Sequence, residues 1–457
     1  MNNTHLWPDT ATINEHGHLA VGGCDTTALA REHGTPLYIF DEATIHAQCR
    51  AYRDALAAGY RGQSSVHYAS KALLNTAIAQ LVASEGLGLD VVSGGELFVA
   101  LRAGVPAKHI HLHGNAKPRA ELEQALDADI GQIVVDTLDE LALLAQLTAG
   151  RTEPQAIMLR LAPGIAADTH AHIQTGHADS KFGLPLAMLD QAAAMLKHAA
   201  GLRLHGLHVH LGSQLFDQAP YEQAVDVLLD CAARLRDEHD ILIEAISPGG
   251  GLGVPYTAEQ TAPDVAASGK ALGQALEAGC AARGLPLPTL IIEPGRSIVA
   301  RAGVALYSVV ARKPLLPQDE RPMTKDEGTL AHMHSSSVLR PSSFVHIDGG
   351  MADNIRPALY EARYTALLAN RANDAASQRV HVAGRFCESG DILIRDVPLP
   401  ATQPGDLLAV AVAGAYTLSM ASNYNLVPRP AVLLLSDGHA RVIQRRETYE
   451  DLVRRDG

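Results

Sequence analysis

Lys71 is a residue whose type and place in the chain suggest chemistry. It directly follows an expected strand at 65–69 and precedes a helical pattern at 72–78, so it lies at a strand-to-helix turn. A lysine in such a turn can have a lowered pKa and act as an amine nucleophile or Schiff-base former. A surface lysine is the alternative interpretation, and other motifs must decide between the two.

Two further segments follow expected strands and could bind a charged ligand. The glycine-rich segment 247–253 (SPGGGLG) offers closely spaced backbone N–H groups that could hold a phosphate, although a tight turn is an equal alternative. The segment 293–296 (EPGR) supplies an acid and a fixed cation. Glu293 could hydrogen-bond a protonated ring nitrogen while Arg296 binds an anion; a buried structural ion pair is the alternative.

Histidines occur in pairs spaced two residues apart. His208 and His210 share one expected strand and therefore one face, and His111 and His113 repeat the arrangement. A metal site is one interpretation. The residues after His210 are Leu-Gly-Ser-Gln rather than further ligands. We therefore favour an imidazole stacked on a planar cofactor, with Ser213 supplying a hydroxyl to a phosphate.

The second half of the chain adds candidates that carry charge or a thiol. Arg356 and Tyr360 are four residues apart and could share one face of a helical turn, for which an exposed helix surface is the alternative. Cys387 next to Glu388 is either a core thiol beside a solvated acid or a general acid beside a residue that binds charge. Tyr416 ends the short motif 414–416 (GAY).

The secondary-structure elements expected to position these residues show two different patterns along the chain. From residue 36 to 300, short apolar runs alternate with Ala- and Leu-rich helical patterns, which favours parallel strands covered by helices. The expected strands are 65–69, 88–93, 109–113, 132–136, 156–161, 204–210, 241–246 and 289–293. Eight strands of this kind favour a closed α/β barrel of the (β/α)₈ type, whose strand carboxyl ends would bring the polar segments together at one rim.

The pattern of expected secondary structure changes after residue 300. Strands without long helices are expected at 304–311, 343–347, 380–383, 407–413 and 431–435. This pattern predicts a second, β-rich domain formed by 301–457 together with the weakly patterned 1–35. The polar segment 317–341 shows no periodicity and is expected to be an exposed flexible insertion.

The composition of the chain argues against some binding partners and locations. The 457 residues include 37 Lys and Arg against 50 Asp and Glu, and the net charge of −13 repels phosphate backbones, so nucleic acid is not an expected partner. Neither a run of eighteen apolar residues nor a basic segment leading into an apolar one is present, so we expect no membrane span or signal peptide. Five scattered cysteines indicate a reducing compartment, and we expect a cytoplasmic protein.

Nine motifs, in order between about residues 36 and 437, resemble those of the diaminopimelate decarboxylases. They are 68–71 (YASK), 90–97 (DVVSGGEL), 180–183 (SKFG), 210–214 (HLGSQ), 249–253 (GGGLG), 293–296 (EPGR), 356–360 (RPALY), 387–391 (CESGD) and 421–425 (ASNYN). That family consists of pyridoxal 5′-phosphate (PLP) enzymes of fold type III, related to alanine racemase and ornithine decarboxylase. The resemblance implies a PLP-binding barrel, a β-rich domain and a homodimer whose active sites are shared.

The resemblance also implies a role for individual residues. Lys71 would hold PLP covalently, His210 would stack on its ring and Glu293 would pair with the pyridine nitrogen. The residues expected to line the rest of the cofactor site, mainly around the phosphate, are Asp90, Ser213, Gly249, Gly250, Gly251, Gly295, Arg296 and Tyr416. The residues expected to bind the substrate are Arg296, Arg356, Tyr360, Glu388 and Tyr416. Cys387 would protonate the substrate carbon, and the Cys-Glu segment would come from the partner subunit.

The implied reaction is the decarboxylation of meso-2,6-diaminopimelate to L-lysine and CO₂, the last step of lysine biosynthesis, without a metal. Arg356 and Glu388 suit the distal amino and carboxylate groups of that substrate. A decarboxylase of ornithine, arginine or carboxynorspermidine is one alternative, and a non-catalytic PLP-binding homologue is another. A metal hydrolase that uses His208 and His210 is the third.

Overall fold

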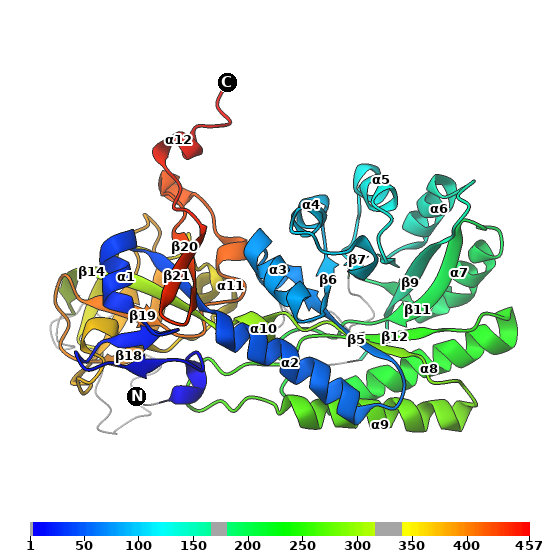
Figure 1. Ribbon diagram of the computed structural model, residues 1–457, viewed down its shortest axis with the longest axis horizontal. Coiled ribbons are helices and arrows are strands. Elements are labelled where there is room, and N and C mark those ends of the chain that lie inside the picture. The colour runs from blue at the N-terminus through cyan, green and yellow to red at the C-terminus, as the bar shows by residue number, and fades with distance from the viewer. Residues whose placement is uncertain (1–2, 166–180, 316–340) are drawn as a thin grey trace, which may run out of the picture.

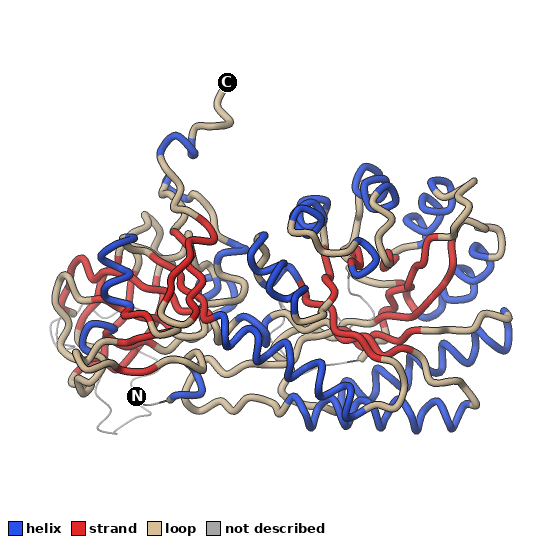
Figure 2. Tube along the Cα trace, in the orientation of Figure 1, coloured by secondary structure: helices blue, strands red, loops and turns tan. Residues whose placement is uncertain are grey.

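A barrel and a second sheet lie side by side along the long axis of the molecule (Figure 1). The structure is a computed structural model that describes residues 3–165, 181–315 and 341–457. Helices gather around the barrel and are sparse in the second sheet (Figure 2). Within the described ranges, no helix has both the length and the apolar character needed to cross a membrane.

The barrel is built from eight parallel strands. They are β5 (Ser64–Ala69), β6 (Gly88–Val91), β7 (Ile110–Leu112), β8 (Gln132–Val135), β9 (Gln155–Ala162), β11 (Leu202–His208), β12 (Ala245–Gly249) and β13 (Thr289–Ile292). Pairing runs β9-β11-β12-β13-β5-β6-β7-β8, and contact between β8 and β9 closes the ring, while the short β10 (Leu184–Pro185) adds to β9. The expected (β/α)₈ barrel is confirmed.

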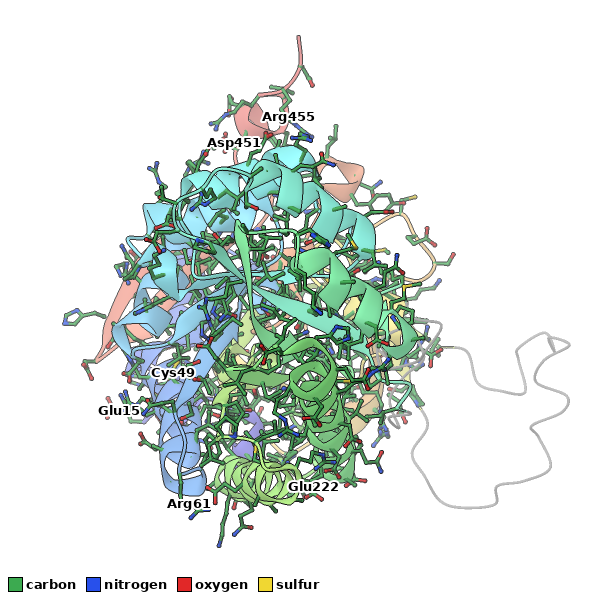
Figure 3. All side chains as sticks on the ribbon, turned by 90° about the vertical axis from the view of Figure 1, so that its right-hand side faces the viewer. Glu15, Cys49, Arg61, Glu222, Asp451 and Arg455 are labelled. Atoms are coloured by element: carbon green, nitrogen blue, oxygen red, sulfur yellow. The ribbon has the colours of Figure 1, made fainter. Side chains whose placement is uncertain are left out.

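Helices cover the outside of this ring. They are α2 (Glu42–Gly59), α3 (Thr76–Ser84), α4 (Gly94–Arg102), α5 (Arg119–Asp127), α6 (Leu138–Leu147), α7 (Leu189–Leu196), α8 (Ala219–His239) and α9 (Val265–Arg283). Asn75, Ser93 and Thr137 cap α3, α4 and α6 by accepting a backbone N–H of the first turn. These caps start each helix soon after a strand. In the end-on view, Arg61 and Glu222 lie at the outer helices (Figure 3).

The barrel interior changes from apolar to polar along the strands. Val134, Met158, Ala245 and Ile291 form a small buried cluster separate from the main core. Two residues further along the same strands, and therefore on the same face, come Asp136, Arg160, Ser247 and Glu293, all buried. Burying polar and charged groups costs free energy unless they are paired. This layer, at the carboxyl ends of the strands, is therefore where a functional site is expected.

The second sheet is predominantly antiparallel and confirms the β-rich second domain. Its strands are β4 (Leu37–Asp41), β14 (Gly303–Pro314), β15 (Ser343–Ile347), β16 (Ala366–Leu368), β17 (Gln378–Ala383), β18 (Ile392–Leu399), β19 (Leu407–Val410), β20 (Ala431–Ser436) and β21 (His439–Gln444). The order is β18-β17-β15-β14-β4-β20-β21, and β19 joins β14 to β16. The last helix, α12 (Tyr449–Leu452), projects from the body of the molecule (Figure 1).

Three details differ from the sequence-based expectations or fall outside the structure. Strand β4, which was not among the expected strands, lies within the segment 36–300 assigned to the barrel but pairs with β14 and β20 of the second sheet. The expected strand at 241–246 begins only at Ala245, because the preceding residues, including the half-exposed Leu242, connect it to α8. The expected insertion at 317–341 lies, except for its last residue, outside the described residues.

The first residues of the chain form their own small unit beside the second domain. It contains the 3₁₀ helix η1 (Thr4–Leu6), the three-stranded sheet β1 (Thr12–Ile13), β2 (Leu19–Val21) and β3 (Cys24–Asp25), and α1 (Thr26–His33). The backbone N–H of Ala372 donates to the carbonyl of Gly17 at 2.8 Å and ties this unit to the second domain.

Candidate active site

Lys71 lies where both domains meet. It belongs to the one-turn 3₁₀ helix η2 (Ser70–Ala72), which directly follows β5, and its side chain is half-buried. The backbone N–H of Tyr416, from the second domain, donates to the Ala72 carbonyl at 2.9 Å. Gly295 packs on the other side, where a Cβ would come within 3.2 Å of the Ala72 Cβ. The turn that carries the candidate nucleophile is therefore fixed by contacts from both domains.

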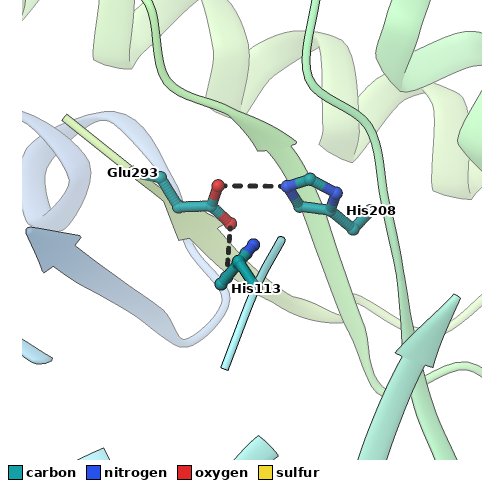
Figure 4. Close-up of side chains that lie close together, drawn as sticks. All are labelled: His113, His208 and Glu293. Atoms are coloured by element: carbon teal, nitrogen blue, oxygen red, sulfur yellow. Dashed lines mark hydrogen bonds and ion pairs between the residues drawn. The ribbon is translucent and has the colours of Figure 1, made fainter. Parts of the chain in front are cut away.

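Glu293 is the charged centre of the barrel (Figure 4). Its carboxylate accepts hydrogen bonds from His208 Nε2 at 3.0 Å and from Ser247 Oγ at 2.7 Å, and His113 Nε2 lies 3.8 Å away. Burial opposes ionisation, but the attraction of His208 and His113 and these hydrogen bonds outweigh it and hold the pKa of Glu293 well below its usual range. A negative charge is thus fixed inside the barrel.

Asp90 lies on β6 close to this carboxylate. Burial raises the pKa of Asp90, the Glu293 charge raises it further, and the Lys71 cation only partly offsets both. Asp90 Oδ1 and His113 Nε2 are buried and have no hydrogen-bond partner in the described part of the chain. Buried polar atoms are normally paired. These two atoms therefore indicate a site prepared for a polar ligand.

Backbone and side-chain donors gather at the glycine-rich segment. Arg296 donates to Ser213 Oγ at 2.9 Å through Nη2 and at 3.3 Å through Nε, and the backbone N–H of Gly250 points toward His210 Nδ1 at 3.5 Å. A Cβ on Gly250 would clash with the Glu293 carbonyl oxygen. Only glycine fits this approach. The guanidinium, the hydroxyl and the bare backbone together can hold a phosphate.

His210 follows β11 and is partly buried beside this segment. Burial lowers the pKa of His210 well below its usual range, and the nearby Lys71 and Arg160 cations act in the same direction. The imidazole is therefore neutral near pH 7. A neutral ring can cover the face of an aromatic cofactor without adding charge to the site.

The two histidines of the alternative metal interpretation, His208 and His210, do not group together. His208 groups with His113 and Glu293, whose candidate ligand atoms lie within 4.8 Å of one another, and within the described ranges His210 is not a member of that group. The ligand set of the metal-hydrolase interpretation, His208 with His210, is therefore not assembled. The hydrogen bond between His208 and Glu293 instead gives His208 a place in the carboxylate network.

Arg356 and Tyr360 both lie on the short helix α11 (Arg356–Tyr360) of the second domain. Arg356 is buried, donates to the Tyr364 hydroxyl at 2.5 Å and stacks over the Tyr256 ring, 4.6 Å from its centroid. Tyr360 is half-buried. The second domain therefore carries a cation into contact with the loop that follows the glycine-rich segment.

Cys387 and Glu388 lie elsewhere within this chain. They are exposed on a turn after β17. The backbone N–H of Cys387 donates to Asn425 Oδ1 at 3.0 Å, and the Tyr424 hydroxyl approaches the Cys387 carbonyl at 3.4 Å. These contacts hold the turn to a loop of its own domain, with both side chains facing outward.

Three site residues were not predicted from the sequence. Arg160 is buried within 4.0 Å of Asp136 at the end of β9, and its position two residues after Met158 was an available signal. Tyr256 and Tyr364 contact the arginines of the site. Tyr256 follows the glycine-rich segment closely, whereas nothing in the local sequence marks Tyr364.

These groups together fit PLP. The half-buried lysine suits its aldehyde, the fixed carboxylate its protonated ring nitrogen, the neutral imidazole its ring face, and the glycine-rich segment with Arg296 its phosphate. His113 Nε2, one of the two atoms without a hydrogen-bond partner among the described residues, lies 3.8 Å from that carboxylate and 3.8 Å from the other, Asp90 Oδ1. The donor set thus matches the aldehyde, the ring nitrogen, the ring face and the phosphate of that molecule.

Comparisons with known proteins agree with this chemistry. The family model described as "Pyridoxal-dependent decarboxylase, pyridoxal binding domain" matches residues 42–300. Diaminopimelate decarboxylase of Bacillus subtilis (strain 168) is 42% identical over 450 residues, which cover 98% of this chain and 97% of that protein. The crystal structure of diaminopimelate decarboxylase from M. jannaschii with L-lysine has a TM-score of 0.84 at 34% identity, covering 98% of each chain. The Helicobacter pylori enzyme with L-lysine has a TM-score of 0.81 at 32% identity, covering 94% of this chain and 98% of that one.

Proposed function

This chain belongs to the diaminopimelate decarboxylases, a family of pyridoxal-dependent decarboxylases, and we infer that it converts meso-2,6-diaminopimelate to L-lysine and CO₂, the last step of lysine biosynthesis. The observation that carries this function is the pair of buried arginines, Arg296 and Arg356, whose guanidinium groups both lie over the ring of Tyr256. A substrate with a second carboxylate suits two buried cations, whereas a diamine precursor such as ornithine lacks that group.

Bound PLP supplies the electron sink that accepts the electron pair left when the substrate carboxylate departs as CO₂. Lys71 holds the cofactor through its amine, and Glu293 keeps the proton on the pyridine nitrogen. His210 covers one face of the ring. The other residues that hold the cofactor are Asp90, Ser213, Gly249, Gly250, Gly251, Gly295, Arg296 and Tyr416.

The end of the substrate that does not react carries both a carboxylate and an amine. Arg296, Arg356, Tyr360 and Tyr416 bind this distal carboxylate, and Glu388 binds the distal amine. Cys387 delivers the proton to the carbon that has lost CO₂. A thiol on an exposed turn can do so if it enters the barrel site of another protomer, so the enzyme is a homodimer with shared active sites. Cysteines 24, 49, 231, 280 and 387 are all unpaired, which supports a cytoplasmic location.

The reaction is tested with the purified, PLP-loaded protein and a panel of amino acids. Meso-diaminopimelate should give L-lysine and CO₂ in equal amounts, while ornithine, arginine and carboxynorspermidine should be turned over far more slowly. Faster turnover of one of those three would assign the chain to another decarboxylase. CO₂ release from no member of the panel would make it a non-catalytic homologue.

Replacing Glu293 with glutamine should lower kcat by about 10²–10³-fold, because the fixed charge that retains the pyridine proton is lost. PLP should still bind through the remaining contacts, which the cofactor absorbance measures separately from turnover. Glu244→Gln is the matched control, because Glu244 is exposed and paired only at the surface with Arg203 and His205. If Glu293→Gln kept kcat within about twofold of wild type, this role for Glu293 would be wrong.

A further inference from the structure

Two buried arginines at the junction of the domains have no acidic partner among the residues that the structure describes. Arg296 is 7% exposed and Arg356 is 5% exposed. Their side-chain hydrogen bonds go to the hydroxyl groups of Ser213, Tyr256 and Tyr364, and within the described ranges neither guanidinium forms an ion pair. Burying unpaired charge is costly. The arrangement is therefore suited to anions that arrive with the cofactor and the substrate.

Tyr256 contacts both guanidinium groups. Its hydroxyl accepts a hydrogen bond from Arg296 Nη1 at 2.9 Å, and the Arg356 guanidinium stacks on its ring. Both guanidinium carbons lie within 6.0 Å of this one ring centroid. Cation–π contact and the hydroxyl dipole both attract positive charge. The Tyr256 side chain therefore lies between the Arg296 and Arg356 guanidinium groups and attracts both of them.

Electrostatics agrees with this contact. Burial opposes ionisation of the phenol, but the Arg296 and Arg356 cations outweigh burial and lower the pKa of Tyr256. Tyr364 packs against the Tyr256 ring edge-on, with centroids 5.3 Å apart at 85°. The phenol is thus held in place by its neighbours and strongly attracted to both cations.

The backbone of Tyr256 is fixed from both domains. Its N–H donates to Gln260 Oε1 at 2.8 Å, and its carbonyl accepts from Thr365 Oγ1 at 3.1 Å. Near the same arginine, Arg356 Nε and Asn354 Nδ2 are buried donors without a partner in the described part of the chain. Such donors call for an acceptor. An anionic group of a ligand would supply one.

We propose that Tyr256 is a positioning residue that sets substrate specificity by holding Arg296 and Arg356 as one site for the carboxylate that the reaction leaves in place. This inference rests on the proposed decarboxylase function. Arg296 supplies a guanidinium group from the barrel, and Arg356 supplies one from the second domain. Tyr256 fixes the distance between these two groups. A ligand with a carboxylate at that end meets both cations, whereas a diamine meets neither.

The test uses the PLP-loaded Tyr256→Phe variant and two probes that differ in this carboxylate. L-lysine carries the carboxylate, and pentane-1,5-diamine lacks it. Removal of the hydroxyl should weaken L-lysine inhibition about tenfold and raise KM for diaminopimelate about tenfold, the size expected for one hydrogen bond to a charged group. Inhibition by the diamine and kcat should each change by less than about twofold.

Tyr60→Phe is the matched control, because Tyr60 is also buried and its hydroxyl donates to the Pro288 carbonyl at 2.6 Å, outside this cluster. Thermal unfolding and cofactor content of both variants should match wild type. Equal weakening of both probes, or no weakening of L-lysine, would overturn the inference. Because inhibitor binding is compared in the cofactor-loaded protein, a wild type that makes no lysine contradicts the proposed function instead.

Discussion

Lys71→Ala should lower kcat/KM for diaminopimelate by at least about 10³-fold, the largest effect expected of any single substitution in this chain. Its amine is the group proposed to hold the cofactor covalently, and no other lysine shares the turn between β5 and α3. PLP retained by the phosphate contacts alone should be removed by dialysis, which the cofactor absorbance follows. CO₂ release measures the loss of turnover.

Lys108→Ala provides the control for loss of a lysine, because Lys108 is exposed and paired with Asp129 at the surface. It should behave as wild type in both assays. A Lys71→Ala protein with more than about a tenth of wild-type kcat/KM would show that Lys71 does not hold the cofactor during turnover.

Mixing two inactive variants should restore activity if the active sites are shared. Cys387→Ala removes the proposed proton donor and should by itself lower kcat by about 10²–10⁴-fold. When it is unfolded and refolded together with Lys71→Ala, half of the dimers should be mixed, and each should contain one site with both residues intact. The mixture should therefore reach about one quarter of wild-type activity.

The exposed turn of Cys387 and Glu388 is the structural reason for this expectation. Each variant refolded alone is the control and should stay inactive. A mixture that also stays inactive, although mass spectrometry detects mixed dimers, would place Lys71 and Cys387 of one chain in the same site. Sedimentation of the wild type as a monomer would equally contradict the homodimer.

The barrel and much of its site follow from local sequence patterns. Apolar runs separated by helical patterns predict the ring of strands, and Lys71, Glu293 and Arg296 are predictable because each follows a strand whose carboxyl end faces one rim. The glycine-rich segment can be predicted to bind a phosphate because its backbone N–H groups bind the anion without help from side chains elsewhere in the chain. For residues that directly follow a barrel strand, their position in the local sequence pattern is enough to predict that they lie at the site.

Contacts between the domains are not predictable in this way. Tyr364 bonds Arg356 within the second domain, but it reaches Tyr256 only because that domain packs on the barrel rim. Strand β4 was not predicted as a strand, and its residues fell in the segment given to the barrel; because all five are buried, their pattern fits either sheet. Cys387 and Glu388 were candidates from their residue types, but the expectation that they enter the site of a partner subunit came only from family resemblance.

The central claim is that the Lys71 amine is joined covalently to PLP. The direct measurement is borohydride reduction of the PLP-loaded protein, followed by proteolysis and mass spectrometry of the peptides. We expect one phosphopyridoxyl group per chain, located on Lys71, together with loss of the cofactor's absorbance band. A group found on another lysine, or on none, would contradict the account.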